Sequence, residues 1–261
     1  MVENQLETLT VVKVGGGVLE DLVSLAGFLD RFVAIPGLKI LVHGGGRVAT
    51  KLSEQLKIKI KIVEGRRITD ADTIDIVTMV YGGLINKKTV AALQARGCNA
   101  GGFTGADMNL INASKRPVKD VDYGFVGDVT QVNHQLLAIL LKSGITPVIA
   151  PLTHDGNGQL LNTNADTIAS EISGAMSDLY AVSLVFCFEK PGVLSDPNND
   201  NSLIPELTAV SYQSFKEQGI IHSGMIPKID NSFDALQKGV QQVIITSAST
   251  LDVNAGTRIS L

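Results

Sequence analysis

The chain has 261 residues, of which 44% are hydrophobic and 18% are charged. That length and apolar content can bury a large core, either as one domain or as two closely joined lobes. The 22 basic and 26 acidic side chains give a net charge of -4, and both signs are scattered along the sequence. This balance argues against nucleic acid or an anionic membrane as the main partner, since both attract concentrated positive charge.

Two further features predict the compartment. The first ten residues are polar and acidic, and no apolar run reaches the ~18 residues of a membrane span, so a cytoplasmic location is expected. The two cysteines, Cys98 and Cys187, are far apart in the sequence and form no C-x-x-C pair. They are expected to be buried thiols rather than disulfide partners or metal ligands.

The hydrophobic pattern predicts the fold class. Runs rich in Val and Ile alternate with longer segments of helical periodicity, which is typical of an α/β fold with helices packed on a mostly parallel sheet. In chain order, the predicted strands are 9–14, 38–43, 99–104, 145–151, 179–188 and 242–246. The predicted helices are 21–34, 47–56, 70–96, 133–142, 165–176 and 225–238.

Shorter signals predict local structure between these elements. The segments 118–132 and 151–162 contain turn residues between strand-like runs, with glycine at both turns, and are predicted to be β-hairpins. Thr69, with Asp72 three residues later, predicts a capping box at the start of the third helix. No internal repeat or low-complexity segment is found.

Two glycine-rich segments follow the first two predicted strands. Lys13 stands near the end of the first strand and is followed by glycines at 15–17, while His43 ends the second and is followed by glycines at 44–46. In a parallel sheet both turns lie at the same edge. Backbone N–H groups without Cβ crowding, together with a nearby lysine, favour a phosphate site. The alternative is that the glycines only permit tight turns.

A dinucleotide site is a second interpretation of these glycines. Neither loop is a Walker A motif, because no G-x-x-x-x-G-K-[ST] occurs in the chain. Residues 44–49 do match the looser G-x-G-x-x-A fingerprint, and Glu64, 20 residues after its first glycine, could bind a ribose. A dinucleotide-dependent oxidoreductase is therefore an alternative, although it uses the second βα turn and leaves Lys13 without a role.

Polar residues open two later helices. Asn162, Asn164 and Asp166 stand at the start of the helix predicted at 165–176, where they can either cap it or point into a site, with Asp166 ordering nearby lysines. Lys228 lies near the start of a later helix, where its charge is unfavourable unless an anion offsets it. A surface lysine is the alternative interpretation of Lys228.

An arginine pair precedes the helix predicted at 70–96. Arg66 and Arg67 can each hold a carboxylate through two parallel hydrogen bonds. A solvated pair on a loop fits the sequence equally well, so this feature alone does not decide between binding and surface roles.

Taken in order, these segments resemble the amino-acid kinase family, and within it the N-acetylglutamate kinases, over essentially the whole chain. The matching segments are Lys13-Val14-Gly15-Gly16, His43-Gly44-Gly45-Gly46, Arg67-Ile68-Thr69, Asn86-Lys87, Asn162-Thr163-Asn164-Ala165-Asp166, Gly224-Met225-Ile226-Pro227-Lys228 and Gly256-Thr257-Arg258-Ile259. Carbamate, aspartate, glutamate and uridylate kinases share the glycine loops and the lysine. The Asn-x-Asn-Ala-Asp and Arg67 segments favour the acylglutamate members.

The resemblance implies one amino-acid kinase domain, a three-layer α/β/α sandwich with an open, mostly parallel sheet. An N-terminal lobe, about 1–178, would bind the acylated amino acid and form a homodimer contact, and a C-terminal lobe, about 179–261, would bind nucleotide. The implied reaction uses ATP and Mg²⁺ to phosphorylate the side-chain carboxylate of an N-acyl-L-glutamate, with N-acetyl-L-glutamate as the first choice. The products would be an acyl phosphate and ADP, in arginine biosynthesis.

The family's site roles carry over by motif. Lys13 and Lys228 would stabilise charge on the transferring phosphoryl group, and Asp166 would position both lysines. The other implied residues are Gly15 and Gly16 for phosphate, and Gly44, Gly45, Arg67, Asn162 and Asn164 for the substrate. No metal-ligating side chain is implied. A carboxylate acceptor is already ionised at neutral pH, so the reaction needs alignment and charge neutralisation rather than a strong base.

Two departures from the family pattern are visible. Family members usually have Thr or Ser followed by Asp at the end of the nucleotide-side strand, whereas this chain has Phe188-Glu189-Lys190. The ribose and adenine contacts are therefore not carried over. Gly17 is an additional glycine in the first loop.

The resemblance leaves further questions of function open. Arg66, beside Arg67, offers a partner for the second carboxylate of N-succinyl-L-glutamate as an alternative substrate. A catalytically inactive amino-acid-sensing relative is another alternative, in which the changed strand end marks lost nucleotide binding. Only about a dozen residues precede Lys13, fewer than the N-terminal helix and linker of arginine-inhibited relatives, so a dimer insensitive to arginine is expected.

Overall fold

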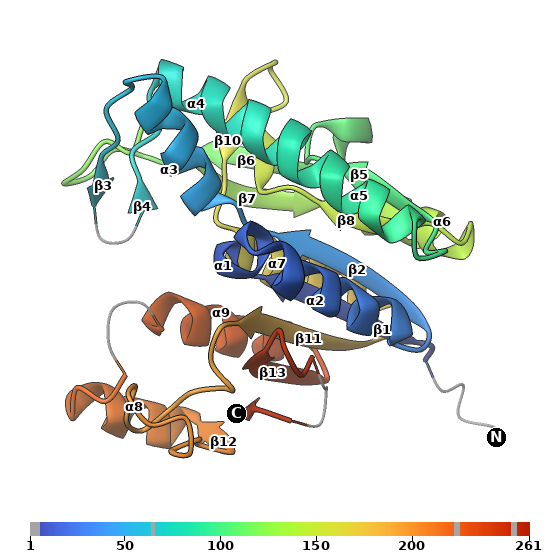
Figure 1. The fold of residues 1–261 in the computed structure, drawn as a ribbon, viewed down its shortest axis with the longest axis vertical. Helices are drawn as coiled ribbons and strands as arrows, with labels where there is room; N and C mark the ends of the chain where they lie inside the picture. The colour runs from blue at the N-terminus through green and yellow to red at the C-terminus, as the bar shows by residue number, and fades with distance from the viewer. Residues whose placement is uncertain (1–5, 64–65, 222–224, 252–254) are drawn as a thin grey trace.

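The computed structural model describes residues 6–63, 66–221, 225–251 and 255–261. Its centre is a sheet of eight strands with helices on both faces (Figure 1). The strands of this sheet are β1 (Thr8–Val14), β2 (Leu38–His43), β5 (Ala100–Phe103), β8 (Thr146–Ile149), β11 (Ala181–Phe188), β12 (Glu206–Thr208), β13 (Gln242–Ser247) and β14 (Thr257–Ser260). Their order is β12-β14-β13-β11-β1-β2-β8-β5.

The pairing is mostly parallel, as predicted. β13, β11, β1, β2, β8 and β5 run in one direction, and β14 is antiparallel to β13. All six predicted strands are present in this sheet, each within a few residues of its expected bounds. The predictions missed β12 and β14, which have only three and four residues and so offer too little sequence for a period-two pattern.

The described helices include the six predicted ones. They are α1 (Gly16–Glu20), α2 (Leu22–Ala34), α3 (Gly46–Gln55), α4 (Ala71–Val77), η1 (Thr78–Ile85), α5 (Asn86–Gln94), η2 (Asp107–Asn109), α6 (His134–Lys142), α7 (Ala165–Met176), α8 (Ala209–Glu217) and α9 (Ile226–Gln237). The long helix predicted at 70–96 is a continuous run of α4, η1 and α5, whose middle turns form a π-helix. Helices α1 and α8 were not predicted.

Alternate residues of the central strand β1 face opposite layers. Leu9 and Val11 pack in one core cluster with α7, whereas Val12 and Val14 pack in a second cluster with α2 and α5. The period of two along a strand produces this division. Because it follows Leu9 and Val11 in the alternation, Lys13 lies on the α7 side of the sheet. The three-layer α/β/α sandwich that the sequence implied is therefore present.

A smaller four-stranded sheet has the order β10-β9-β6-β7. Its strands are β6 (Ile111–Lys115), β7 (Gly127–Val132), β9 (Leu152–His154) and β10 (Leu160–Asn162). β9 and β10 form the hairpin predicted at 151–162, which confirms that prediction. The hairpin predicted at 118–132 is wrong, because β7 pairs with β6 instead.

The predicted turn of that second hairpin has another partner. Tyr123 accepts a backbone hydrogen bond from the N–H of Thr69 at 2.9 Å, and Gly124 bridges to the same residue. The predicted capping box is also wrong, because Asp70 caps α4 by accepting from the Thr73 N–H. The Thr69 hydroxyl instead accepts from Asn162 Nδ2 at 3.0 Å. Thr69 thus joins three segments that are distant in sequence.

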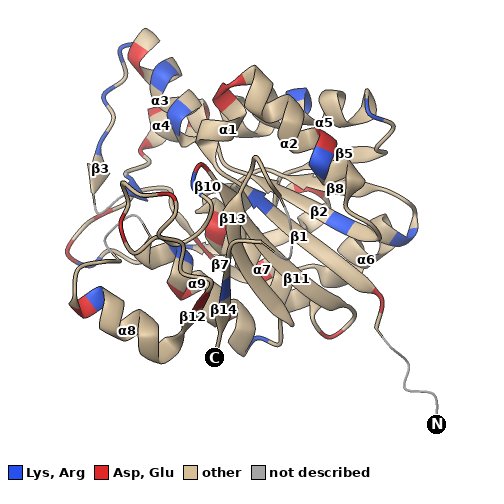
Figure 2. Ribbon diagram, turned by 60° about the horizontal axis from the view of Figure 1, so that its bottom comes forward, with Lys and Arg blue, Asp and Glu red and all other residues tan. Residues whose placement is uncertain are grey.

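The remaining described elements are the two-residue strands β3 (Ile62–Val63) and β4 (Arg66–Arg67), which form a small antiparallel sheet. Lys and Arg are interspersed with Asp and Glu over the ribbon (Figure 2), in agreement with the mixed charge of the sequence. Within the described residues, no helix has the length and apolarity needed to cross a membrane.

A substitution at Gly105 tests the packing between β5 and the smaller sheet. A Cβ there would lie 2.6 Å from the Ile111 carbonyl oxygen and 2.9 Å from that of Leu152, and backbone atoms cannot rotate away as side chains do. We expect Gly105→Ala to lower the free energy of unfolding by about 1–3 kcal/mol. Gly83→Ala is the matched control, since a Cβ at this exposed helical position meets no atom within 4 Å.

Urea unfolding monitored by circular dichroism measures both variants. Gly83→Ala should be neutral or stabilising by up to about 1 kcal/mol, because alanine is the better helix former. A Gly105→Ala protein as stable as the parent would contradict the tight backbone packing at this position.

Candidate active site

The two glycine loops lie side by side at the carboxyl ends of β1 and β2, where Val14 pairs with His43. The Gly15 N–H donates to the Cys187 carbonyl at 3.0 Å, and the Gly44 N–H donates to the Val14 carbonyl at 3.1 Å. The resemblance assigned Gly15 to phosphate and Gly44 to substrate, but the amides of both glycines already have carbonyl acceptors and extend the sheet ladder.

The backbone amides of Gly16 and Gly45, in contrast, have no carbonyl acceptor among the described residues. Both glycines line the same cavity. Gly16 is the first residue of α1 and Gly45 is the N-cap of α3, and backbone N–H groups at a helix start have no acceptor within the helix. Gly16 and Gly45 are therefore the loop amides that can donate to oxygens of a ligand.

Gly45 is required by the helix packed against it. A Cβ on Gly45 would lie 2.6 Å from Ile85 Cδ1 and 2.7 Å from Tyr81 Cδ1. Both side chains belong to the π-helical segment η1, and π-helical turns are frequent at functional sites. The absence of a Cβ thus lets η1 approach the second glycine loop closely.

Three ionised side chains meet beside these loops. Asp166 accepts a hydrogen bond from Lys228 Nζ through Oδ2 at 2.8 Å, and Lys13 Nζ lies 2.8 Å from Oδ1. Their side chains are only 10–14% exposed. β1 supplies Lys13, the first turn of α7 supplies Asp166, and α9 supplies Lys228. The three residues that the sequence placed together are therefore in contact.

The charges of this cluster depend on one another. Burial alone would raise the pKa of Asp166, but the two adjacent lysines more than offset this and hold the pKa well below its ordinary 3.8. Burial also lowers the pKa of Lys13; Asp166 opposes that effect and Lys228 adds to it. Two cations around one anion leave a net positive charge, which suits binding of a phosphoryl group.

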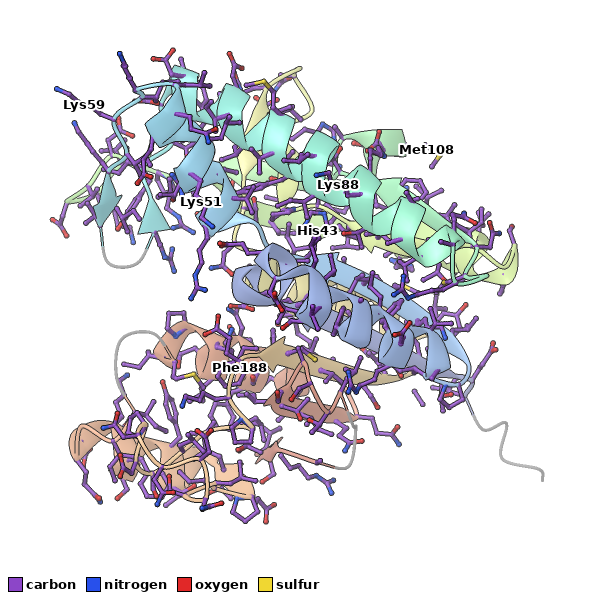
Figure 3. The ribbon with its side chains drawn as sticks, in the orientation of Figure 1. His43, Lys51, Lys59, Lys88, Met108 and Phe188 are labelled. Carbon is purple, nitrogen blue, oxygen red and sulfur yellow. The ribbon has the colours of Figure 1, made fainter. Side chains whose placement is uncertain are left out.

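A buried network below the second glycine loop was not predicted. The fully buried His43 donates from Nδ1 to the Gly44 carbonyl at 2.8 Å, and its Nε2 accepts from Asn86 Nδ2 at 3.2 Å. The roles of the two ring nitrogens follow from these partners. Burial lowers the pKa of His43 to about 4, so the ring is neutral at pH 7. Figure 3 shows His43 in the interior between α2 and α5.

Asn86 connects this network to the sheet. Its Nδ2 also donates to the Val148 carbonyl at 2.9 Å, and Lys87 Nζ donates to its Oδ1 at 3.2 Å. The resemblance included Asn86-Lys87 without a role for either residue. The structure indicates that Asn86 and His43 hold the second glycine loop in place.

Arg67 lines the same cavity as Lys13 and Asp166. Its Nη2 donates to the Gly46 carbonyl at 2.9 Å and to Thr50 Oγ1 at 2.6 Å. Its buried Nη1 has no hydrogen-bond partner within the ranges that the structure describes. The guanidinium is thus fixed by α3 with a donor left for a ligand. Sequence analysis missed Thr50 and Tyr81, the latter a neighbour of Arg67, because neither belongs to a recognisable motif.

The two asparagines have separate roles. Asn164 caps α7, since its Oδ1 accepts from the backbone N–H of Asp166 at 2.7 Å and of Thr167 at 3.2 Å. Asn162 donates to Thr69 as described above. Both also line the cavity, so the capping role of Asn164 and a ligand-facing position occur together.

These groups surround a cavity of about 420 Å³. Of the residues implied from the sequence, those that line it are Lys13, Gly16, Gly44, Gly45, Arg67, Asn162, Asn164 and Asp166. Lys228 reaches it through Asp166, and Gly15 instead lines a neighbouring cavity of about 350 Å³ beside Phe188 and Glu189. The exposed Arg66 lines the rim together with Arg116, which is paired with Asp128.

A third, apolar cavity of about 90 Å³ lies beyond the end of β11. Phe188, Ile220 and Met225 line it, and Figure 3 shows Phe188 at the end of that strand. Lys190, which also lines it, pairs with Asp200 at 2.9 Å. Two residues that the sequence singled out, Glu64 and Gly224, lie outside the described residues.

The depressed pKa of Asp166 predicts how stability changes with pH. Its contribution is present above the unfolded-state value near 3.8 and is lost as the pH falls toward the folded-state value. At pH 7, Asp166→Asn should lower the free energy of unfolding by about 3 kcal/mol, because it leaves two lysines buried without their anion. From about pH 5 downward, the difference from the parent should shrink, by at most about 1.4 kcal/mol per pH unit.

Urea unfolding at pH 7, 5, 4 and 3.5 measures this difference. The control is Asp30→Asn, which removes an exposed ion pair with Arg96 and should change stability by less than about 1 kcal/mol. A difference between parent and Asp166→Asn that stays constant across this range would show that the carboxylate is not held by the lysines.

Comparisons with known proteins identify the family. The model of the amino acid kinase family matches residues 8–247. Acetylglutamate kinase from Bacteroides thetaiotaomicron is 59% identical over 253 residues, which are 97% of this chain and 98% of that protein. The structure of smu.665 from Streptococcus mutans has a TM-score of 0.80 and 27% identity, and the match covers 97% of this chain and 98% of that one.

The fold is shared more widely. Carbamate kinase from Giardia lamblia bound to AMP-PNP has a TM-score of 0.67 at 14% identity, and the match covers 98% of both chains. Membership of this family explains both glycine loops and also Lys13. The interpretation as a dinucleotide-dependent oxidoreductase gave Lys13 no role. The chain belongs to the amino acid kinase family.

Proposed function

We propose that the chain is an ATP-dependent kinase that phosphorylates the side-chain carboxylate of N-acetyl-L-glutamate in arginine biosynthesis. The observation that carries the proposal is a single cavity lined both by Arg67 and by Lys13 and Asp166 of the Lys13–Asp166–Lys228 cluster. Such a cavity suits a substrate with two carboxylates, one fixed and one reacting. The name of the 59% identical relative, acetylglutamate kinase, supports the same substrate.

In the proposed reaction, an oxygen of the substrate's side-chain carboxylate attacks the γ-phosphorus of ATP. A new P–O bond forms as the bond to the β-phosphate oxygen breaks, and ADP leaves. Negative charge spreads over the oxygens of the transferring group. Lys13 and Lys228 stabilise that charge, and Asp166 holds their ammonium groups about one hydrogen-bond length from its own oxygens. Catalysis is then mainly electrostatic, without a general base.

The substrate is proposed to lie between the loops and Arg67. The free donor of the Arg67 guanidinium binds the α-carboxylate, since a fixed guanidinium matches a carboxylate well. Asn162 and Asn164 lie beside the acylamino group. The amides of Gly16 and Gly45 donate to phosphoryl and carboxylate oxygens, and Gly44 contributes backbone shape rather than its own N–H.

The nucleotide is proposed to occupy the side of the site formed after residue 178. The cavity at Gly15 and Glu189 would hold phosphates, and the apolar cavity beside Phe188 would hold the adenine. The apolar cavity is lined only by residues after 178, which supports a nucleotide-binding C-terminal lobe of about 179–261. The phosphate cavity also has lining residues from the N-terminal lobe of about 1–178, so the phosphates would lie between the two lobes. Mg²⁺ is proposed to enter with ATP and to neutralise phosphate oxygens; among the described residues, no group of three or more potential metal ligands is found.

Acetyl is favoured over succinyl as the acyl group, because the highly identical relatives are named acetylglutamate kinases. The same names favour an active enzyme over an amino-acid sensor. We also propose a homodimer through the N-terminal lobe, where Met79, Leu84 and Ile139 expose apolar side chains that a contact would cover. A cytoplasmic location is proposed because the reaction draws on ATP.

Substitution of either lysine tests the catalytic assignment. We expect Lys13→Ala and Lys228→Ala each to lower kcat by about a hundredfold or more, since charge stabilisation in a desolvated site contributes ~3 kcal/mol per group. Lys51→Ala is the control, because Lys51 is exposed and projects from α3 (Figure 3). ADP release by folded, purified proteins measures the rates. Near-parental kcat in both site variants would remove the lysines from the catalytic role.

A substrate panel tests the reaction itself. Hydroxylamine converts an acyl phosphate to a hydroxamate, so it detects the proposed product directly. With ATP, we expect hydroxamate from N-acetyl-L-glutamate, a lower kcat/KM with N-succinyl-L-glutamate, and almost none with free L-glutamate, which lacks the acyl group. ADP release without hydroxamate would exclude a carboxylate acceptor, and a higher kcat/KM for the succinyl compound would reverse the choice of acyl group.

A further inference from the structure

Both departures from the family pattern, Gly17 and Glu189, meet at Arg47 beside the first glycine loop. Arg47 Nη1, in the first turn of α3, donates to Glu189 Oε1 at 2.9 Å. A Cβ on Gly17 would lie 1.8 Å from the same oxygen and 2.9 Å from Arg47 Nη1. The missing Cβ of Gly17 is therefore what allows the carboxylate and the guanidinium to meet over this loop.

Arg47 stands where two cavities adjoin. It lines the cavity of about 420 Å³ that contains Lys13 and Asp166, and also the cavity of about 350 Å³ beside Gly15 and Glu189. In the proposed function the first cavity holds the transferring phosphoryl group and the second holds the remaining phosphates. The Arg47 guanidinium is thus near the position expected for the terminal phosphates of ATP.

The charge of Arg47 has no local explanation within its helix. A cation in the first turn of a helix is disfavoured by the helix dipole, and no other carboxylate pairs with Arg47 in the described part of the chain. Its ion pair with Glu189 is weak, because both side chains are largely exposed, 62% for Arg47 and 59% for Glu189. A phosphate carries more charge and more acceptor oxygens than a carboxylate, so it is the stronger partner for a guanidinium.

We propose that Arg47 is a further phosphate-binding residue, which exchanges Glu189 for the terminal phosphate of bound ATP. The inference rests on the proposed kinase function. Lys13 and Lys228 approach the phosphoryl group from the side of Asp166, and Arg47 approaches it from α3. Glu189 holds the guanidinium near its binding position, but after the exchange its carboxylate is a like charge beside the phosphates and opposes their binding.

This exchange predicts that substitutions of Arg47 and of Glu189 change the affinity for AMP-PNP in opposite directions. Arg47→Ala should weaken binding of AMP-PNP about tenfold and raise KM for ATP by a similar factor, with a smaller change for ADP, which lacks the third phosphate. Glu189→Gln should tighten AMP-PNP binding about threefold, because it removes both the competitor and the like charge. Arg47→Lys should restore part of the loss. Isothermal titration calorimetry with AMP-PNP and with ADP measures these affinities on the full chain.

Two controls separate this role from a structural one. Arg96→Ala removes a partly buried arginine that pairs with the exposed Asp30, away from both cavities, and should leave both affinities unchanged. Urea unfolding should show similar small changes in stability for Arg47→Ala and Glu189→Gln. If the ion pair only joins α3 to the end of β11, both variants will shift AMP-PNP affinity in the same direction.

The failure of this proposal can be told apart from failure of the proposed function. A parent protein that binds neither AMP-PNP nor ADP would argue against the kinase function itself. Two outcomes would overturn the role of Arg47 and leave the kinase function standing. One is an Arg47→Ala variant that binds AMP-PNP as tightly as the parent does, and the other is a Glu189→Gln variant that binds AMP-PNP more weakly than the parent does.

Discussion

The site depends on one carboxylate that holds two lysines. Asp166 lies between the ammonium groups of Lys13 and Lys228 in a setting that is 10–14% exposed. Without it, two like charges would be buried close together, which is strongly disfavoured. The arrangement also requires three elements in register: β1 in the middle of the sheet, α7 across one of its faces, and α9 beside α7. The layered fold therefore serves to bring these three charged residues together.

The parts of the fold that were predicted from sequence share one property. β1, β2 and β11 are short segments rich in apolar residues, most of them buried, and α2 and α7 have clear helical periodicity, so each element carries its own signal. The failed predictions involve choices between partners. β7 could pair in a hairpin with the segment before it, across the turn at Gly124, or with β6. The sequence near Gly124 does not show that Thr69 pairs with this turn. Pairing across long sequence separations is decided by the whole fold.

The site shows the same division. Motifs that recur in a family, such as the glycine loops, Asp166 and Lys228, could be carried over from the resemblance, and the structure brings them to one cavity. Thr50 and Tyr81 could not, because their contacts with Arg67, and the packing of Tyr81 on Gly45, join segments that are separated in the sequence. The amides of Gly15 and Gly44 show the opposite case: their sequence position suggests free donors, but the neighbouring strands supply carbonyls that accept them. Which backbone N–H groups remain free to bind a ligand depends on how far the hydrogen bonds between neighbouring strands continue past the strand ends.

The position of β1 has a consequence for how the chain folds during synthesis. β1 is made before the other described strands, and one of its edges pairs with β2, which follows it in the sequence. Its other edge pairs with β11, in the register Thr8 to Ala181. This edge must therefore wait for roughly 170 further residues, which takes about 9–34 seconds at about 5–20 residues per second. During that interval a long apolar strand edge lacks its native partner, and such edges readily pair with other chains. The most buried strand of the finished enzyme is therefore the one most exposed to aggregation on the ribosome.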